Sequence, residues 1–482
     1  MLEEILEERR KKLEKYKETA DPYPAEARRD MSLSELSEQF NELVEKGGSL
    51  DIVGRVSAWR DQGKIIFLDI KDELGKFQIV LSETECADFV RAQETTDIGD
   101  FVEASGIVFK TKRGEQSLQA KNFRIISKNL RPLPSEWYGI EDIELKLRKR
   151  YLDLALNPEV REMFIKKDIF WNTIREFLKK EKFHEVETSV LEAVPGGAEA
   201  EPFVTHHNAL DQDFFLRISL ELPLKRLLVG GFEKVFEIGR IFRNEGIDRE
   251  HLQDYTQMEC YWAYANYEDM MRLTREMYQL VIKNMFDSLV THRGDMDINW
   301  GGEWPKVDYY EAFNREAGID LTSATVDDLK KKAIELGVRL EPNLGRGRLI
   351  DLVYKKTVRP TLLQPCFLVN PPADIEPLAK RLVNDHHRVA RFQIIAGGTE
   401  LGKGFSELND PIDQRERFED QMKLREAGDQ EAQMIDEDFV EALEYGMPPA
   451  AGFGMSERLF AVLMDKPVRE TVIFPLMRRE EK

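Results

Sequence analysis

The sequence predicts an α+β protein in which a small β-barrel precedes a larger domain with an antiparallel β-sheet flanked by helices. Short β-rich runs crowd the segment between Leu50 and Ile126, and a linker with Pro132 and Pro134 follows them. Beyond the linker, strand-like runs alternate with helical stretches without a regular βαβ period, which favours an antiparallel sheet. The 482 residues also exceed what one hydrophobic core usually supports, so we expect several domains.

Residues 1–48 are expected to form a helical appendage. Leu2, Ile5, Leu6 and Leu13 follow a helix-like spacing among charges of both signs. This mixture is unlike the apolar core of a secretion signal, and we expect a cytoplasmic protein.

Composition excludes some classes of function. The formal charge of −20 and the pI near 5.1 argue against coating nucleic acid through bulk positive charge, although a local site remains open. No apolar run reaches the roughly 18 residues of a membrane span, so no membrane partner is expected. The three cysteines are far apart and lack a CxxC pair, which favours buried thiols over disulfides or zinc.

Residues 49–130 are expected to form the barrel. Its runs are DIVGRVSAW, KIIFLDI, KFQIVL, FVEASGIVF and SLQAKNFRII, separated by turn-forming residues. Five short strands of this kind are typical of a barrel of the oligonucleotide-binding type, the OB-fold. The linker, residues 131–150, ends in the basic segment ELKLRKRY.

Residues 151–482 are expected to form the larger domain, with a helical insertion around 265–340. It opens on a long amphipathic helix, whose apolar positions are Val160, Met163, Phe164, Phe170, Ile174, Phe177 and Leu178. FFLRISL, KVFEIGRIF, RFQIIAG and TVIFPLM read as strands.

Residues 235–264 group side chains that suit a nucleotide and an acid. They are Arg243, Glu245, His251, Tyr255, Glu259 and Tyr261. An arginine binds phosphate or carboxylate, an aromatic ring stacks on a purine, and a glutamate accepts from an exocyclic amine. An exposed hairpin with ion pairs explains any one of them, but not the whole set.

Residues 391–418 hold a second candidate group. On one strand, Lys403, Phe405 and Glu407 share a face and Glu400 has the opposite parity, so a bulge at Gly402 or Gly404 would be needed to bring both inward. A Glu407 buried in an apolar pocket implies a positively charged ligand, whereas a solvated edge glutamate implies none.

Residues 446–465 form the third group. Gly452 and Gly454 allow a tight backbone turn, and Arg458 then opens an apolar helix whose start is suited to an anion. Alone, this pattern is as well explained by a helix entry with a structural arginine.

These three segments, in this order, resemble motifs 2 and 3 of class II aminoacyl-tRNA synthetases and the amino-acid pocket between them. The specific likeness is to the lysyl branch. It rests on GGAEAEPFVTHHNALDQDFFLRISLELPLKRLLVGGFEKVFEIGRIFRNEGID, PLAK, GFSELNDPIDQRERF and ALEYGMPP, and it extends over nearly the whole chain. The resemblance implies ATP-dependent activation of L-lysine and its transfer to tRNA(Lys) by a homodimer, with two or three Mg²⁺ ions bound mainly through ATP.

The resemblance also implies roles for single residues. Arg243 and Arg458 would be catalytic, and ATP would be held by Arg243, Glu245, His251, Tyr255, Glu400 and Arg458. Lysine would contact Gly197, Glu221, Arg243, Glu259, Tyr261, Lys403, Phe405 and Glu407. Aspartyl enzymes share this fold but need a cation where this chain has Glu407, so charge complementarity favours lysine.

In the barrel, the family pattern implies that Phe67 stacks on the central anticodon base, that Gln78 bonds its edge and that Arg60 assists. Such stacking is worth about 1–3 kcal/mol. The other interpretation of Phe67 is a core phenylalanine.

Several positions depart from the pattern. In motif 1, Ser189 replaces a proline and Lys182 a glycine, which puts the dimer interface in doubt. Glu201 stands in place of an arginine, and Ser456 and Glu457 alter the approach to Arg458. Gln393 replaces one of two glutamates that approach magnesium, leaving Glu400 as the only carboxylate of the proposed metal pair, and Lys403 replaces an asparagine. Two alternatives are open for Lys403: its ammonium points at the substrate carboxylate and forms a charge-assisted bond, which we expect, or it folds toward Glu407 and imitates the substrate ammonium.

These departures keep two alternatives open, an enzyme that modifies another protein and a nonenzymatic descendant. Phe67 and Gln78 in a recognisable barrel argue against the first alternative. Arg243, Tyr255 and Arg458 argue against the second.

Overall fold

The computed structural model describes residues 2–134, 142–246, 251–340, 344–427, 432–479 and divides the chain into two compact units, Met1–Asp142 and Ile143–Lys482. Part of the expected linker, residues 135–141, lies outside the described residues. No helix in the described ranges is long and apolar enough to cross a membrane.

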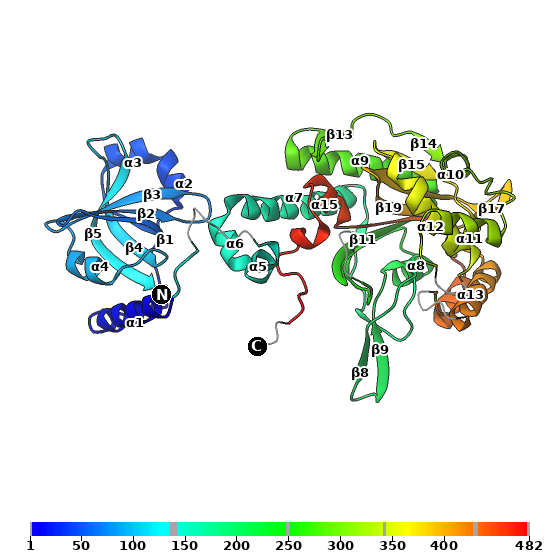
Figure 1. Ribbon diagram of the computed structural model, residues 1–482, viewed down its shortest axis with the longest axis horizontal. Coiled ribbons are helices and arrows are strands. Elements are labelled where there is room, and N and C mark those ends of the chain that lie inside the picture. Colours follow the sequence, from blue (N-terminus) through cyan, green and yellow to red (C-terminus); the bar gives the residue numbers. More distant parts are fainter. Residues whose placement is uncertain (1, 135–141, 247–250, 341–343, 428–431, 480–482) are drawn as a thin grey trace. The chain divides into compact units, whose positions relative to one another are not determined.

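The first unit is a closed barrel with strands in the order β1-β2-β3-β5-β4 (Figure 1). The strands are β1 (Leu50–Asp61), β2 (Ile65–Lys71), β3 (Lys76–Ser82), β4 (Phe101–Lys110) and β5 (Gln116–Ser127). Alternate residues such as Ile66, Leu68 and Ile70 point into the barrel core, and Phe67 and Asp69 lie between them on the outer face. Each of the five expected runs is therefore a strand.

Helices surround this barrel. They are α1 (Leu2–Lys17), α2 (Leu33–Glu38), α3 (Phe40–Lys46) and α4 (Phe89–Thr95). A capping box between Ser32 and Glu35 begins α2, and Tyr16 anchors α1 by donating to the Ile125 carbonyl. The expected helical appendage thus contains three helices, whereas α4 was missed.

The second unit is built on an eight-stranded sheet in the order β14-β15-β18-β19-β20-β11-β10-β6. These strands are β6 (His184–Glu185), β10 (Lys234–Phe242), β11 (Asp254–Ala263), β14 (Lys306–Asp308), β15 (Cys366–Val369), β18 (Arg391–Ala396), β19 (Thr399–Ser406) and β20 (Ala450–Ser456). All neighbours are antiparallel except the two edge pairs, β14 with β15 and β10 with β6, which are parallel. The sheet is mixed at its edges rather than wholly antiparallel.

Smaller ribbons complete the strands of the second unit. They are β7 (Leu191–Glu192), β8 (Val204–His207), β9 (Gln212–Leu216), β12 (Val290–Arg293), β13 (Met296–Asn299), β16 (Arg381–Leu382) and β17 (Asp385–Val389). In Figure 1, β8 and β9 form a hairpin that extends away from the sheet.

Helices of the second unit include those that cover both faces of the large sheet. The helices of this unit are α5 (Ile143–Arg148), α6 (Arg150–Leu156), α7 (Pro158–Lys180), α8 (Glu221–Val229), α9 (Tyr267–Phe286), α10 (Tyr309–Ala317), α11 (Val326–Glu335), α12 (Arg346–Thr357), α13 (Pro411–Glu426), α14 (Glu437–Glu444) and α15 (Arg458–Leu463). The apolar stripe of α7 packs with α9 against Met258 and Cys260, whereas α8 packs on the other face with Tyr261 and Ala263. The odd-numbered side chains of β11 therefore face the same side of the sheet as α8, and the candidate site lies on this side.

Two local predictions were wrong. TVIFPLM is not a strand, because only a short 3-10 turn, Val468–Thr471, is regular there, and Pro475 lacks the amide hydrogen that a strand ladder requires. Gly452 and Gly454 lie inside β20 rather than in a turn.

Lys182 adopts a left-handed conformation with φ 66°. Such a conformation favours glycine, which gives a physical reason for glycine at this position in the family pattern.

Candidate functional site

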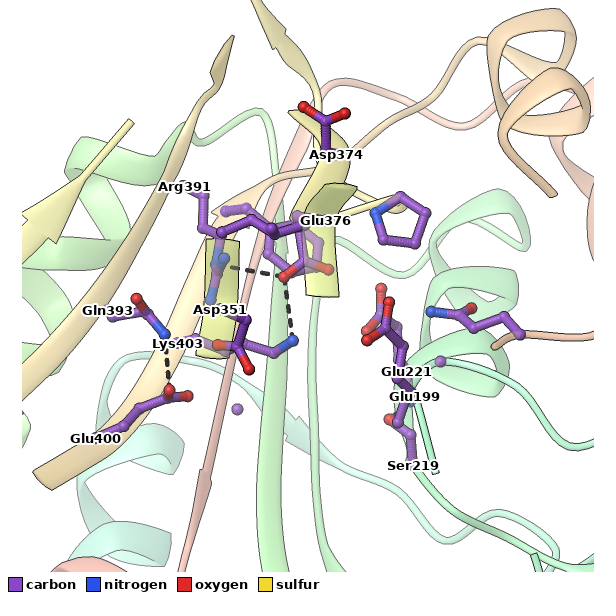
Figure 2. A pocket seen from close by; sticks show the side chains of 18 of the residues that line it. Glu199, Ser219, Glu221, Asp351, Asp374, Glu376, Arg391, Gln393, Glu400 and Lys403 are labelled. Carbon is purple, nitrogen blue, oxygen red and sulfur yellow. Dashed lines mark hydrogen bonds and ion pairs between the residues drawn. The ribbon is translucent and has the colours of Figure 1, made fainter. Parts of the chain in front are cut away.

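A cavity of about 790 Å³ opens on the face of the large sheet that α8 covers. Its floor comes from β11, β18, β19 and β20, and its wall includes the loop around Gly197. Figure 2 shows Glu199, Ser219 and Glu221 facing Lys403, Gln393 and Glu400 from the opposite side. Residues far apart in the sequence, such as Glu199 and Lys403, thus surround one space.

A bulge in β19 gives this floor its side chains. The register between β18 and β19 shifts so that Ile394 pairs with Gly402 and Ile395 with Glu400, which leaves Leu401 as the extra residue. Leu401 points into the core, while Glu400 and Lys403 both line the cavity. The expectation of a bulge was right, and its position is one residue before Gly402.

The acidic end of the cavity contains two buried glutamates and a buried lysine of the chain itself. The Lys225 ammonium lies 2.5 Å from the Glu221 carboxylate, one turn away on α8, and also pairs with Glu407. It lies 5.3 Å from the centroid of the Phe405 ring. The cation that pairs with Glu407 in the structure is therefore Lys225. This pairing corrects the inference that burial of Glu407 by itself requires a charged ligand.

One lysine does not neutralise this end. Burial raises the pKa of Glu221 to about 7, and it raises that of Glu407 well above its usual value, in both cases despite Lys225. Although burial opposes it, the two carboxylates raise the pKa of Lys225, which stays charged. An additional cation would be favourable here.

Glu259 supplies a third carboxylate, held by neutral donors. Its oxygens accept from the Ser219 hydroxyl at 2.8 Å, the Leu220 amide at 3.0 Å, the Gln257 amide at 2.6 Å and the Tyr261 hydroxyl at 2.8 Å. These hydrogen bonds fix both Glu259 and Tyr261 in the cavity floor.

Two glycines make room for these carboxylates. A side chain at Gly452, which pairs with Tyr261 across the strands, would collide with the Glu407 carboxylate and the Tyr261 ring. Gly197 has φ 82°, and a Cβ there would lie 2.9 Å from that of Glu221. Sequence reasoning marked both glycines, but not the contacts that require them.

Arg243, Tyr255 and Arg458 form the other end of the cavity. The Arg243 Nε donates to the Ile218 carbonyl at 3.2 Å, and its guanidinium lies 5.7 Å from the centroid of the Tyr255 ring. Arg458 begins α15, as expected, and its Nη1 donates to the Glu400 carbonyl at 3.4 Å. Two guanidinium groups beside an aromatic ring suit a nucleotide phosphate and base.

Glu457 holds the start of α15. Its buried carboxylate pairs with Lys167 of α7 and accepts from the Thr256 amide at 3.3 Å. This carboxylate thereby joins the ends of β11 and β20 next to Arg458.

Glu245 and His251 are not brought to the cavity lining. Both lie in the segment between β10 and β11, of which 247–250 are outside the described residues, and His251 is exposed. Their assignment to ATP stays a prediction.

Lys403 has a partner that the sequence did not indicate. Its ammonium lies 3.1 Å from Glu376 Oε2, and the same oxygen lies 3.3 Å from Arg391 Nε (Figure 2). Although burial opposes it, Glu376 raises the pKa of Lys403. Lys403 therefore does not fold onto Glu407, and the second alternative for this residue is not the one the structure adopts.

Gln393 and Glu400, the expected metal pair, are bonded to each other. Gln393 Nε2 donates to Glu400 Oε2 at 2.7 Å, as Figure 2 shows. Within the described part of the chain there is no cluster of three or more His, Cys, Asp or Glu side chains suited to a metal ion. The pair thus presents one carboxylate with an oxygen already engaged, a poor donor set for Mg²⁺, which prefers several oxygen ligands.

Sequence reasoning missed Lys225, Glu376 and Glu199. Glu199 lines the cavity, and burial there together with Glu376 raises its pKa to about 7. The sequence does contain a signal for Lys225, because it lies one helical turn after Glu221 and can pair with it. Glu376 had none, because its contacts come from β18 and β19.

The candidate site of the first unit lies on the outer face of the barrel. Arg60 of β1 pairs with Phe67 of β2 in the register, and its guanidinium bonds the Asp69 carboxylate at 3.2 Å. Gln78 is half-buried and accepts from the Ser117 hydroxyl at 2.8 Å. Phe67 is half-buried outside the core, so the core interpretation of this residue is wrong.

Comparisons with known proteins agree with this architecture. Residues 142–478 match the family model described as tRNA synthetases class II (D, K and N), and residues 51–126 match the OB-fold nucleic acid binding domain. The chain is 45% identical to the lysine–tRNA ligase of Moorella thermoacetica, over 96% of this chain and 95% of that protein. It is 44% identical to that of Carboxydothermus hydrogenoformans, over 99% and 98%, and 42% identical to that of Roseiflexus castenholzii, over the whole of both.

Proposed function

On the premise that this chain belongs to the class II tRNA synthetases of the D, K and N group, and within it to the lysine–tRNA ligase family, we propose that it is itself a lysine–tRNA ligase. The enzyme activates L-lysine with ATP to lysyl-adenylate and transfers lysine to the 3′ end of tRNA(Lys). The observation that carries the choice of lysine is the acidic end of the cavity, where the three carboxylates of Glu221, Glu259 and Glu407 gather and a single ammonium, that of Lys225, pairs with Glu221 and Glu407.

The proposed pose places the substrate between the two ends of the cavity. The α-amine meets Glu221 and the backbone of Gly197, and the side-chain ammonium meets Glu407, Tyr261 and Glu259. Phe405 walls the methylenes. Raised pKa values at Glu221 and Glu407 support this pose, because a second cation relieves the carboxylates that Lys225 leaves uncompensated.

The chemistry proposed for the other end is positioning and charge stabilisation. Arg243 contacts the lysine carboxylate and the ATP α-phosphate, where negative charge grows during attack, and Arg458 holds the γ-phosphate. Tyr255 stacks on adenine, which Glu245 also contacts, and His251 and Glu400 approach the phosphates. One preorganised donor at such a position is worth about 3 kcal/mol in the transition state.

The remaining parts of the proposal concern partners and organisation. Phe67, Gln78 and Arg60 read the anticodon, magnesium arrives on the ATP phosphates, and two copies associate. We retain the division into 1–48, 49–130, 131–150 and 151–482 as the working domain assignment.

ATP–pyrophosphate exchange with each of the twenty amino acids tests the proposal. We expect exchange with lysine alone at low concentration. Exchange that depends on aspartate or asparagine, and not on lysine, would overturn it.

A further inference from the structure

The residues around Glu400 do not fit a divalent ion held by the protein itself. We propose that the Gln393 amide holds Glu400 without a metal, so that this chain has no Glu400-dependent divalent site until nucleotide binds. Gln393 donates a hydrogen bond to Glu400, and the Lys403–Glu376–Arg391 ion pairs place a lysine ammonium on the strand position opposite Gln393. The inference rests on the proposed function only in taking ATP as the nucleotide. Its test uses the protein without nucleotide and is therefore independent of that function.

The Gln393 amide is turned with its hydrogens toward Glu400. Its N–H donates to Glu400 at 2.7 Å, and Gln393, the donor, is only 5% exposed. A metal bound by both side chains would need the amide oxygen in place of the amide hydrogens, at the cost of this hydrogen bond. The Gln393 amide therefore already holds the Glu400 carboxylate in place, as a metal ion would.

A cation, Lys403, lies opposite Gln393 in the sheet. Lys403 pairs with Gln393 in the register of β18 and β19, so both side chains leave the sheet on the same face. The ammonium is held there by Glu376, whose carboxylate is 4% exposed and also pairs with Arg391. A divalent ion bound between Gln393 and Glu400 would meet the like charge of the Lys403 ammonium on the same face, which opposes its binding.

Further oxygen ligands are scarce around Glu400 among the described residues. Asp351 and Glu199 line the same cavity, yet the described residues do not bring three candidate ligands together around any point. Mg²⁺ bound by one carboxylate relies on phosphate oxygens and water for the rest of its shell. Such an ion belongs to the nucleotide rather than to the protein.

Electron paramagnetic resonance of free Mn²⁺ tests the inference on the whole nucleotide-free chain. Wild type and Glu400→Gln are titrated side by side, and the readout is the binding that disappears in the variant. We expect identical titrations. Mn²⁺ binding by wild type that Glu400→Gln removes would overturn the inference, whatever amino acid the enzyme activates.

A gain-of-site variant provides the positive arm. Gln393→Glu combined with Lys403→Met restores a second carboxylate and removes the opposing charge, and should bind Mn²⁺ at least roughly tenfold more tightly than wild type. Gln212→Glu, on the exposed β8–β9 hairpin, is the matched amide-to-acid control and should change nothing. With circular dichroism confirming that the double variant is folded, unchanged Mn²⁺ binding would refute the roles given to Gln393 and Lys403.

Discussion

Replacing Lys225 by methionine should destabilise the catalytic unit in a strongly pH-dependent way. The lysine side chain is fully buried and is the shared partner of Glu221 and Glu407. Methionine preserves much of its volume but leaves two buried carboxylates without their cation. Breaking a buried ion pair from one side typically costs about 3–5 kcal/mol, and we expect a loss of this size near neutral pH and above.

The pH dependence follows from the raised pKa values. Even in wild type, the rise of the Glu221 pKa from 4.5 to about 7 means that folding takes up a proton in this interval, so stability falls as the pH rises through it. At 1.36 kcal/mol for each pH unit, this amounts to about 3 kcal/mol for one carboxylate. Without Lys225 the pKa values of Glu221 and Glu407 rise further. The loss of unfolding free energy in Lys225→Met is therefore smaller in acid, where both carboxylates are protonated.

Urea unfolding followed by tryptophan fluorescence measures this effect. Trp171, Trp262, Trp300 and Trp304 all lie in the second unit. The difference between wild type and Lys225→Met should be about 3–5 kcal/mol near pH 8 and below about 2 kcal/mol near pH 5.5. Lys306→Met is the control, because its half-exposed pair with Glu268 contributes less than about 1 kcal/mol. A loss that is the same at both pH values would show that packing, and not charge, explains the role of Lys225.

Three further predictions concern function. Arg243→Ala should abolish lysine-dependent pyrophosphate exchange with an unchanged unfolding midpoint, because its proposed partners are ligands; normal exchange would remove Arg243 from catalysis. Phe67→Ala should slow transfer to tRNA while adenylate formation continues, because the ring lies on the outer face of the barrel and outside its core; equal loss of both activities would refute anticodon stacking. Lys403→Met should raise the Michaelis constant for lysine and leave that for ATP nearly unchanged, since a charge-assisted bond to the substrate carboxylate is lost. A lowered constant for lysine would show instead that Lys403 competes with the substrate ammonium.

The parts of the fold that follow from patterns among neighbouring residues could be predicted from the sequence. Short β-rich runs between turn-forming residues located the five barrel strands, and the three-and-four spacing from Val160 to Leu178 located α7. TVIFPLM failed because β-branched and aromatic residues alone do not make a strand without a neighbour to pair with. The short helix α4 was hidden inside a connection between strands.

The candidate site was predictable only in part, because sequence spacing does not reveal charge pairing across the fold. Arg243, Tyr255, Glu259 and Arg458 were found, and the structure brings them to one cavity. The pairing of Lys403 with Glu376 depends on a segment 27 residues earlier, and that of Glu407 with Lys225 on a helix from another part of the chain. Such contacts change what a charged residue is available to bind.

Charging of a complete bacterial tRNA mixture with labelled lysine tests the central claim most directly. We predict that the label is esterified to tRNA(Lys) and that Phe67→Ala suppresses this transfer without blocking lysyl-adenylate formation. Lysyl-adenylate that forms while no tRNA accepts lysine, with the label passing instead to another protein, would contradict the assignment and favour a protein-modifying enzyme.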